Sequence, residues 1–162
     1  MSQQRTLLLD LEETIIPVFG DWFVPSPYAD NIKTVVEKFK PHKIELFSWA
    51  IYNQADVDKF NEHRAYIESE LDLTFNCIHD IASLITLYNR STSVKIIDTL
   101  DFFDFVTKER FLFDMAVKAK HYPNEHLLLL DDAVSSHRIV KADTNTVIDV
   151  VNTADNLSLI SF

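Results

Sequence analysis

The sequence of 162 residues is 47% hydrophobic and 25% charged, and 15 basic residues against 25 acidic ones give a formal net charge of −10. This composition indicates a globular protein, and its acidity argues against extended nucleic-acid binding. The single cysteine excludes an internal disulfide and a zinc site built from cysteines, and the single glycine excludes glycine-rich phosphate-binding loops. No signal peptide or membrane-spanning segment is evident, so we expect a cytoplasmic protein.

The predicted elements alternate between apolar strands and amphipathic helices. A buried strand over 7–9 leads to Asp10 and Glu12, and the segment 17–28, rich in proline and aromatic residues, predicts a short hairpin or flap. The remaining predictions, in chain order, are helix 30–40, strand 44–48, helix 54–71, a run over 75–88 that fits either a strand or a helix, strand 94–98, helix 107–120, strand 127–130, a helix or turn over 135–142, and strand 146–151.

These strands are apolar throughout rather than alternating between apolar and polar residues. Such strands are typical of a parallel sheet that is covered by helices on both faces. The sequence therefore predicts one α/β domain over 1–162, a Rossmann-like three-layer α/β/α sandwich around a largely parallel sheet. We expect a small cap or none, with a possible flap at 17–28 and a modest insert within 72–106.

Polar residues follow three of the predicted strands, at the points where the strands end: Asp10 and Glu12, Ser48, and Asp131 with Asp132. Because the carboxyl ends of parallel strands meet at one edge of the sheet, we expect these side chains to converge. Lys108, at the start of a predicted helix, adds a cation there, with Lys95, Lys118 and Lys120 as alternatives. Carboxylates, a hydroxyl group and a lysine together suit Mg²⁺ and a phosphate group.

In this order and spacing the residues resemble the motifs of the haloacid dehalogenase-like hydrolases. That superfamily begins with D-x-D-x-T after a strand, followed by a strand-terminal serine or threonine, a lysine, and paired acids after a late strand. The corresponding residues here are Asp10-Leu11-Glu12-Glu13-Thr14, Ser48, Lys108 and Asp131-Asp132. The resemblance spans essentially the whole chain and implies a minimally capped phosphatase.

The resemblance also implies a role for each matched residue. Asp10 would attack phosphorus and form an aspartyl-phosphate, and Glu12 would protonate the leaving group and then activate water. Ser48 and Lys108 would hold the phosphoryl group. The second acid of the motif is glutamate here rather than aspartate, which places its carboxyl group about one C–C bond farther from the backbone.

Mg²⁺ is the cofactor that the resemblance implies. Its ligands would be the Asp10 carboxylate, the Glu12 backbone carbonyl and Asp132, with Asp131 nearby. A site without a large cap is open, so the phosphorylated substrate could be a small phosphomonoester, a nucleotide or a phosphoprotein, and an oligomer could close the site. No membrane partner is expected.

Two other interpretations compete with a phosphatase. A receiver domain also uses acids, a hydroxyl group, a lysine and Mg²⁺, but its acid pair follows the first strand, whereas the pair here comes late. A catalytically silent domain that binds a protein partner through the same surface is the alternative favoured by Glu12 and by the uncertain lysine. The six histidines lack a metal-ligand spacing such as H-E-x-x-H, and Cys77 is expected to be a small buried residue.

Overall fold

A computed structural model describes residues 3–96 and 98–162 and shows a six-stranded mixed sheet with the order β3-β2-β1-β4-β6-β5. Every neighbouring pair of strands is parallel except β5 and β6, which are antiparallel. The predicted α/β fold with a largely parallel central sheet is therefore confirmed. The strands are β1 (Gln4–Leu9), β2 (Lys43–Leu46), β3 (Cys77–Ile78), β4 (Glu125–Asp131), β5 (His137–Lys141) and β6 (Thr146–Asn152).

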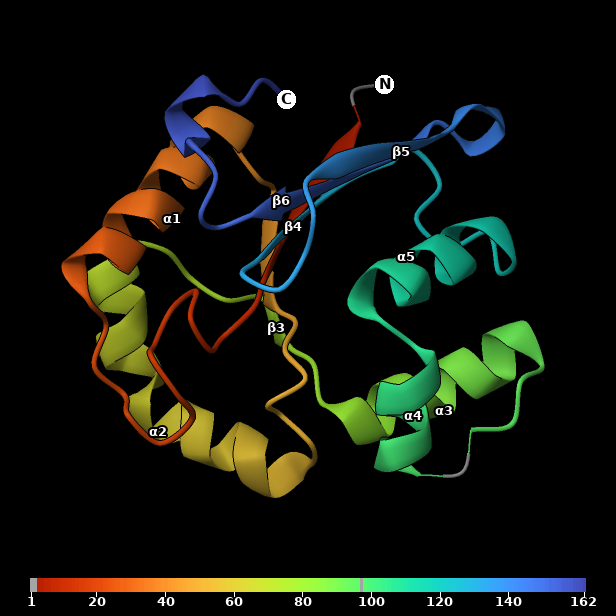
Figure 1. Ribbon diagram of the computed structural model, residues 1–162, viewed down its shortest axis with the longest axis horizontal. Helices are drawn as coiled ribbons and strands as arrows, with labels where there is room; N and C mark the ends of the chain where they lie inside the picture. The colour runs from red at the N-terminus through yellow and green to blue at the C-terminus, as the bar shows by residue number, and fades with distance from the viewer. Residues whose placement is uncertain (1–2, 97) are drawn as a thin grey trace.

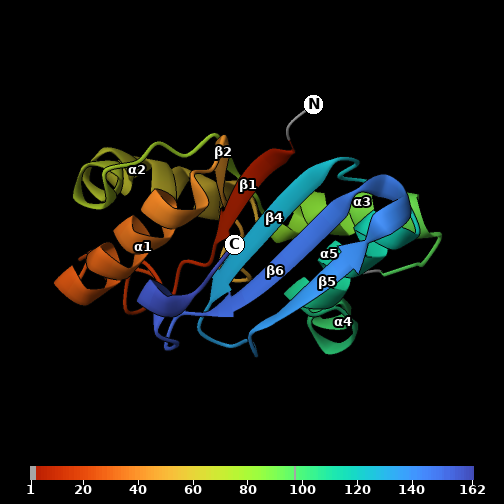
Figure 2. The ribbon, with the colours of Figure 1, turned by 90° about the horizontal axis from the view of Figure 1, so that it is seen from above.

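Helices cover both faces of this sheet, as Figures 1 and 2 show. One layer contains α1 (Ser26–Phe39) and α2 (Gln54–Leu71). The opposite layer contains α3 (Ile81–Thr92), α4 (Thr99–Phe105) and α5 (Lys108–Val117). Two short 3₁₀ helices follow later in the chain: η1 (Ala142–Thr144) lies between β5 and β6, and η2 (Leu157–Leu159) packs against α1. The sheet with its two helical layers forms the predicted sandwich.

Strand β1 shows why the central strands of this sheet contain continuous apolar runs. Leu7 and Leu9 belong to the core formed with α1 and α2, whereas Leu8 belongs to the core on the α3–α5 side. All three leucines are at most 3% exposed. Because successive side chains of a strand point to opposite faces, a strand that lies between two helical layers needs an apolar residue at every position.

The predicted strand over 94–98 is wrong for the residues that the structure describes. Residues 94–96 are irregular, and Asp98 caps α4 by accepting a hydrogen bond from the backbone N–H of Asp101; residue 97 lies outside the described residues. A short apolar run forms a strand only if a neighbouring strand is free to pair with it. Here β2 pairs with β3 instead, so β3 is the edge strand on that side of the sheet in the part of the chain that the structure describes.

The helix or turn predicted over 135–142 is also wrong. The chain forms the edge strand β5, which pairs with β6 so that Ile139 lies opposite Ile148, and η1 follows it. Ile139 packs on the core while Val140 is exposed, an alternation typical of an edge strand. Asn145, in the left-handed conformation (φ 53°), then connects this strand to β6.

Two ambiguous segments are resolved by local signals. Within 75–88, the two-residue strand β3 is followed by α3, which Asp80 caps by accepting a hydrogen bond from the Ser83 N–H. The hairpin predicted within 17–28 does not form: residues 17–25 are an irregular loop, and α1 begins at Ser26 with Pro27 in its first turn. Within the described ranges, no helix is both long and apolar enough to cross a bilayer.

Lys40, which ends α1 in the left-handed conformation (φ 53°), provides a stability test of the fold. We expect Lys40→Gly to raise the free energy of unfolding by about 0.5–1 kcal/mol, because glycine adopts this conformation without Cβ strain. Lys33→Gly, at an exposed position inside the same helix, is the matched control and is expected to lower it by about 1 kcal/mol. Urea unfolding of both variants measures the two changes. If both substitutions changed the free energy of unfolding in the same direction, the left-handed conformation of Lys40 would be contradicted.

Candidate active site

Three carboxylates meet where β1 and β4 end. Asp10 directly follows β1, Asp131 is the last residue of β4, and Asp132 comes next. The two strands are parallel neighbours, and the Asp10 N–H donates a hydrogen bond to the Leu130 carbonyl at 3.1 Å. Carboxylate oxygens of the three aspartates consequently lie within 4.8 Å of one another. The structure thus brings residues 121 positions apart in the sequence to one edge of the sheet, as the order of the strands requires.

Lys108 supplies the positive charge at this cluster. It is the first residue of α5, whose N-cap is Thr107, and its Nζ donates a hydrogen bond to Oδ1 of Asp10 at 2.7 Å and another to Oδ2 of Asp131. The ammonium group also lies 5.8 Å from the centroid of the Trp49 ring. Of the alternative lysines, Lys118 lies near Asp114 instead, 3.6 Å from its carboxylate.

Charge at the cluster is unbalanced, because three carboxylates surround one ammonium group. Asp10 is only 6% exposed. Burial raises its pKa, Lys108 lowers it and Asp131 raises it, so that the pKa of Asp10 reaches about 7. Burial likewise raises the pKa of Asp132. Oxygen ligands with excess negative charge are the donor set that Mg²⁺ prefers, and a divalent cation would relieve the repulsion among them.

Glu12 lies beside the carboxylate cluster but does not belong to it. The backbone turns sharply after β1, where the N–H groups of Ile15 and Ile16 donate hydrogen bonds to the Leu11 carbonyl at 2.9 and 3.1 Å. The Glu12 carboxylate accepts a hydrogen bond from the Phe19 N–H at 2.9 Å. This contact holds the carboxylate toward the loop over 17–25, on the wall of the cavity that the aspartates line.

Ser48 is the second residue after the end of β2. Its side chain is buried, and its Oγ accepts a hydrogen bond from the Ala50 N–H at 3.2 Å, which leaves the hydroxyl proton free to be donated. Ser48 lines the same cavity as Asp10 and Lys108. All six residues predicted from the sequence therefore line one open cavity of about 620 Å³, with Asp10, Lys108, Asp131 and Asp132 at its charged centre.

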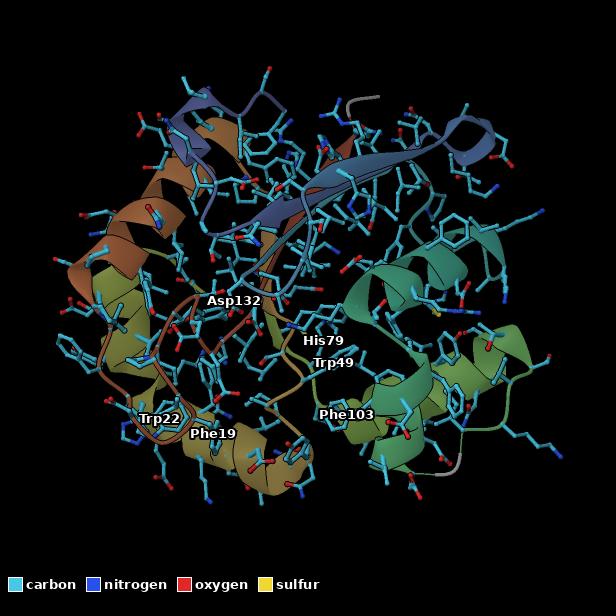
Figure 3. All side chains as sticks on the ribbon, viewed as in Figure 1. Phe19, Trp22, Trp49, His79, Phe103 and Asp132 are labelled. Atoms are coloured by element: carbon cyan, nitrogen blue, oxygen red, sulfur yellow. The ribbon has the colours of Figure 1, made fainter. Side chains whose placement is uncertain are left out.

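The aromatic wall of this cavity was not predicted from the sequence. Trp49, Tyr52 and Phe103 line it, and the Tyr52 and Phe103 rings meet edge to face with centroids 5.8 Å apart. Trp49 and Phe103 lie on the α4 side in Figure 3, well away from Trp22. The position of Trp49 directly after Ser48 was the one available signal, whereas only the tertiary fold brings Phe103 to the cavity.

Trp22 does not cover the cavity. Its ring stacks on His63 with centroids 4.6 Å apart and meets Phe60 of α2 edge to face. Phe19 also meets this ring edge to face, with centroids 5.2 Å apart, and Figure 3 labels both residues in this part of the molecule. From the sequence, Trp22 and Phe23 could cover a bound substrate, although packing in the core is the more common role of such residues. The structure shows packing for Trp22, whereas Phe23 is exposed. The loop over 17–25 contributes Pro17 and Val18 to the cavity instead.

The cavity thus combines a buried carboxylate, a bridging lysine, a hydroxyl group and an acid on the wall. A carboxylate of this kind can act as a nucleophile, and the lysine and the hydroxyl group can hold an anion. No family model, no curated protein and no solved structure matches this chain, so the site's own chemistry is the basis for inferring what the protein does.

Proposed function

We propose that the protein is a Mg²⁺-dependent phosphatase that hydrolyses a phosphomonoester through an aspartyl-phosphate on Asp10. The observation that carries this proposal is the meeting of the Asp10, Asp131 and Asp132 carboxylates within 4.8 Å, with Lys108 2.7 Å from Asp10. The motif resemblance adds the inference that the chain is a minimally capped member of the haloacid dehalogenase-like hydrolases.

The donor set fits the proposed metal. The ligands available at the cluster are carboxylate oxygens, and the raised pKa of Asp10, to about 7, reflects burial and the nearby Asp131 charge. Asp10 and Asp132 would hold Mg²⁺ together with the Glu12 backbone carbonyl, and Asp131 would support them. When bound, Mg²⁺ neutralises charge on the carboxylates and on the phosphoryl oxygens.

Each of the site residues has a role in the two steps of the proposed reaction. The Asp10 carboxylate attacks phosphorus, the bond from phosphorus to the leaving oxygen breaks, and Glu12 gives that oxygen a proton. Glu12 next takes a proton from water, whose oxygen attacks the phosphorus of the aspartyl-phosphate. The bond between phosphorus and the Asp10 oxygen breaks, which releases inorganic phosphate and restores the Asp10 carboxylate. Lys108 and Ser48 hold the phosphoryl oxygens through both steps. The hydrogen bond from Phe19 orients Glu12 for these transfers.

Hydrolysis of p-nitrophenyl phosphate with and without Mg²⁺ tests the proposal, followed by a panel of nucleotides, sugar phosphates and phosphopeptides. We expect turnover that requires Mg²⁺ and stops with a chelator, and a phosphorylated Asp10 peptide after acid quenching and mass spectrometry. Turnover that does not depend on Mg²⁺ would contradict the mechanism. A lack of turnover on the whole panel would contradict the phosphatase and favour the silent binding module, for which Glu12 in place of aspartate is the supporting observation.

Lys108→Met tests how the phosphoryl group is held. Methionine keeps most of the side-chain volume and removes the ammonium group, so we expect kcat/KM to fall about 10²-fold with the fold retained. Lys118→Met, near the other end of the same helix and about half exposed, is the control and is expected to leave kcat/KM within about twofold. A Lys108→Met enzyme with full activity would exclude Lys108 as the phosphate ligand.

A further inference from the structure

A second cluster of ligand-type side chains lies at the β3 edge of the sheet. Strand β3 pairs in parallel with β2 so that Cys77 lies opposite Glu45, and the His79 N–H continues the pairing by donating to the Leu46 carbonyl at 3.0 Å. Directly opposed residues in a sheet point to the same face, as do residues two apart in one strand. The register therefore brings Glu45, Cys77 and His79 together on one face, although 32 positions separate Glu45 from Cys77 in the sequence.

The three side chains are in close contact. Sγ of Cys77 lies 4.0 Å from Nδ1 of His79, and Nε2 of His79 lies 3.0 Å from Oε1 of Glu45. One ligand atom from each residue can be chosen so that all three lie within 4.8 Å of one another. The side chains of His79 and Glu45 are 27% and 19% exposed, so an ion can reach them from solvent and a water molecule can complete its coordination.

Hydrogen bonds link the three side chains in a row, from Cys77 through the two ring nitrogens of His79 to Glu45. A metal ion would take the place of protons in this row, because zinc binds the thiolate, the neutral imidazole and the carboxylate.

We propose that Glu45, Cys77 and His79 form a Zn²⁺ site, separate from the magnesium site proposed above. A thiolate, an imidazole nitrogen and a carboxylate oxygen are the three donor types that zinc binds, whereas Mg²⁺ prefers oxygen alone. Zinc bonds of about 2.0–2.3 Å place tetrahedral ligands roughly 3.2–3.8 Å apart. The contacts of His79 with Cys77 and Glu45 use different ring nitrogens, and only one of these nitrogens can bind the ion. One ligand atom from each residue lies within 4.8 Å of the other two, so side-chain rotations must bring the three atoms closer together to bind the ion.

Zinc at this position joins the shortest strand of the sheet to its neighbour. Strand β3 has two residues and forms one edge of the sheet, with β2 as its only paired strand among the described residues. The His79 ring also meets Phe47 edge to face at 5.8 Å, and Phe47 directly precedes Ser48 of the candidate active site. The Phe47 ring also packs against Trp49, with ring centroids 5.2 Å apart. The proposed ion therefore stabilises the segment that carries Ser48 and Trp49.

Cobalt titration of the full chain, in a reducing buffer without thiols, tests the proposal because Co²⁺ replaces Zn²⁺ and reports its ligands by absorption. We expect a thiolate-to-cobalt charge-transfer band that saturates at one equivalent and disappears when Zn²⁺ is added. Cys77→Ser is expected to abolish the band, and His79→Asn and Glu45→Gln are expected to weaken binding by about tenfold or more. Zn²⁺ is expected to raise the Tm of the parent protein and not that of Cys77→Ser.

Two controls separate this site from other metal binding. His137→Asn removes an exposed histidine outside the cluster, and Asp10→Asn disables the proposed magnesium site; both variants are expected to keep the charge-transfer band. Circular dichroism and thermal melts verify that each variant folds. A missing band in the folded parent protein, an unchanged band in His79→Asn, or a band lost in Asp10→Asn would overturn the zinc site, whether or not the protein proves to be a phosphatase.

Discussion

Asp10→Asn is expected to lower kcat for phosphomonoester hydrolysis by at least about 10³-fold. The amide has the size of the carboxylate but cannot attack phosphorus, and water must then react without the covalent step. The backbone position is held by the hydrogen bond from the Asp10 N–H to the Leu130 carbonyl, which the substitution retains. Steady-state hydrolysis of p-nitrophenyl phosphate at saturating Mg²⁺ measures the loss.

Asp30→Asn is the control for this substitution. It makes the same chemical change at an exposed position on α1, outside the cavity, and is expected to keep kcat within about twofold. Asp10→Asn must also fail to take up phosphate in the acid-quench experiment. An Asp10→Asn enzyme with more than about a tenth of the parent kcat would exclude a covalent role for Asp10, since a nucleophile contributes far more than tenfold.

The same residue is expected to make stability depend on pH. Burial raises the pKa of Asp10 from 3.8 to about 7, so between these values the folded protein binds a proton that the unfolded chain has released. Stability therefore falls as pH rises from about 4 to about 7 and is constant above that range. A shift of this size corresponds to about 4 kcal/mol between the low-pH and high-pH limits. The carboxylate proposed as the nucleophile is thus expected to destabilise the metal-free fold at neutral pH.

Urea unfolding of the parent protein and of Asp10→Asn from pH 4 to pH 8, in the presence of a chelator, measures this effect. We expect the stability of Asp10→Asn relative to the parent protein to increase by about 3–4 kcal/mol across that range. Mg²⁺ at pH 8 is expected to stabilise the parent protein and to stabilise Asp10→Asn less, because the ion binds the ionised carboxylate. A difference between the two proteins that does not change with pH would show that Asp10 has an ordinary pKa.

Part of the fold and the site was determined by the sequence alone. Continuous apolar runs such as Leu7–Leu9 and Leu127–Leu130 predicted buried parallel strands, because only strands covered on both faces need apolar residues at every position. Parallel strands direct their carboxyl ends to one edge, which made the proximity of Asp10 to Asp131 and Asp132 predictable without coordinates. The same rule led to Ser48 after the next strand along the chain.

Other features depended on contacts that the sequence does not show. Whether 137–141 becomes a strand depends on the free edge of β6, and whether 94–98 becomes one depends on which strand pairs with β2. Propensity is a weak signal for such short segments, since the available partner decides the outcome.

Side-chain positions at the two sites were likewise decided by the tertiary structure. The Glu12 carboxylate turns toward the Phe19 N–H, and Lys108 rather than Lys118 reaches the aspartates, because the entry of α5 lies at the sheet edge. The register of β2 with β3 places Glu45 beside Cys77 and His79. Spacing in the sequence can reveal ligands on one element, but only strand pairing brings ligands from different elements together.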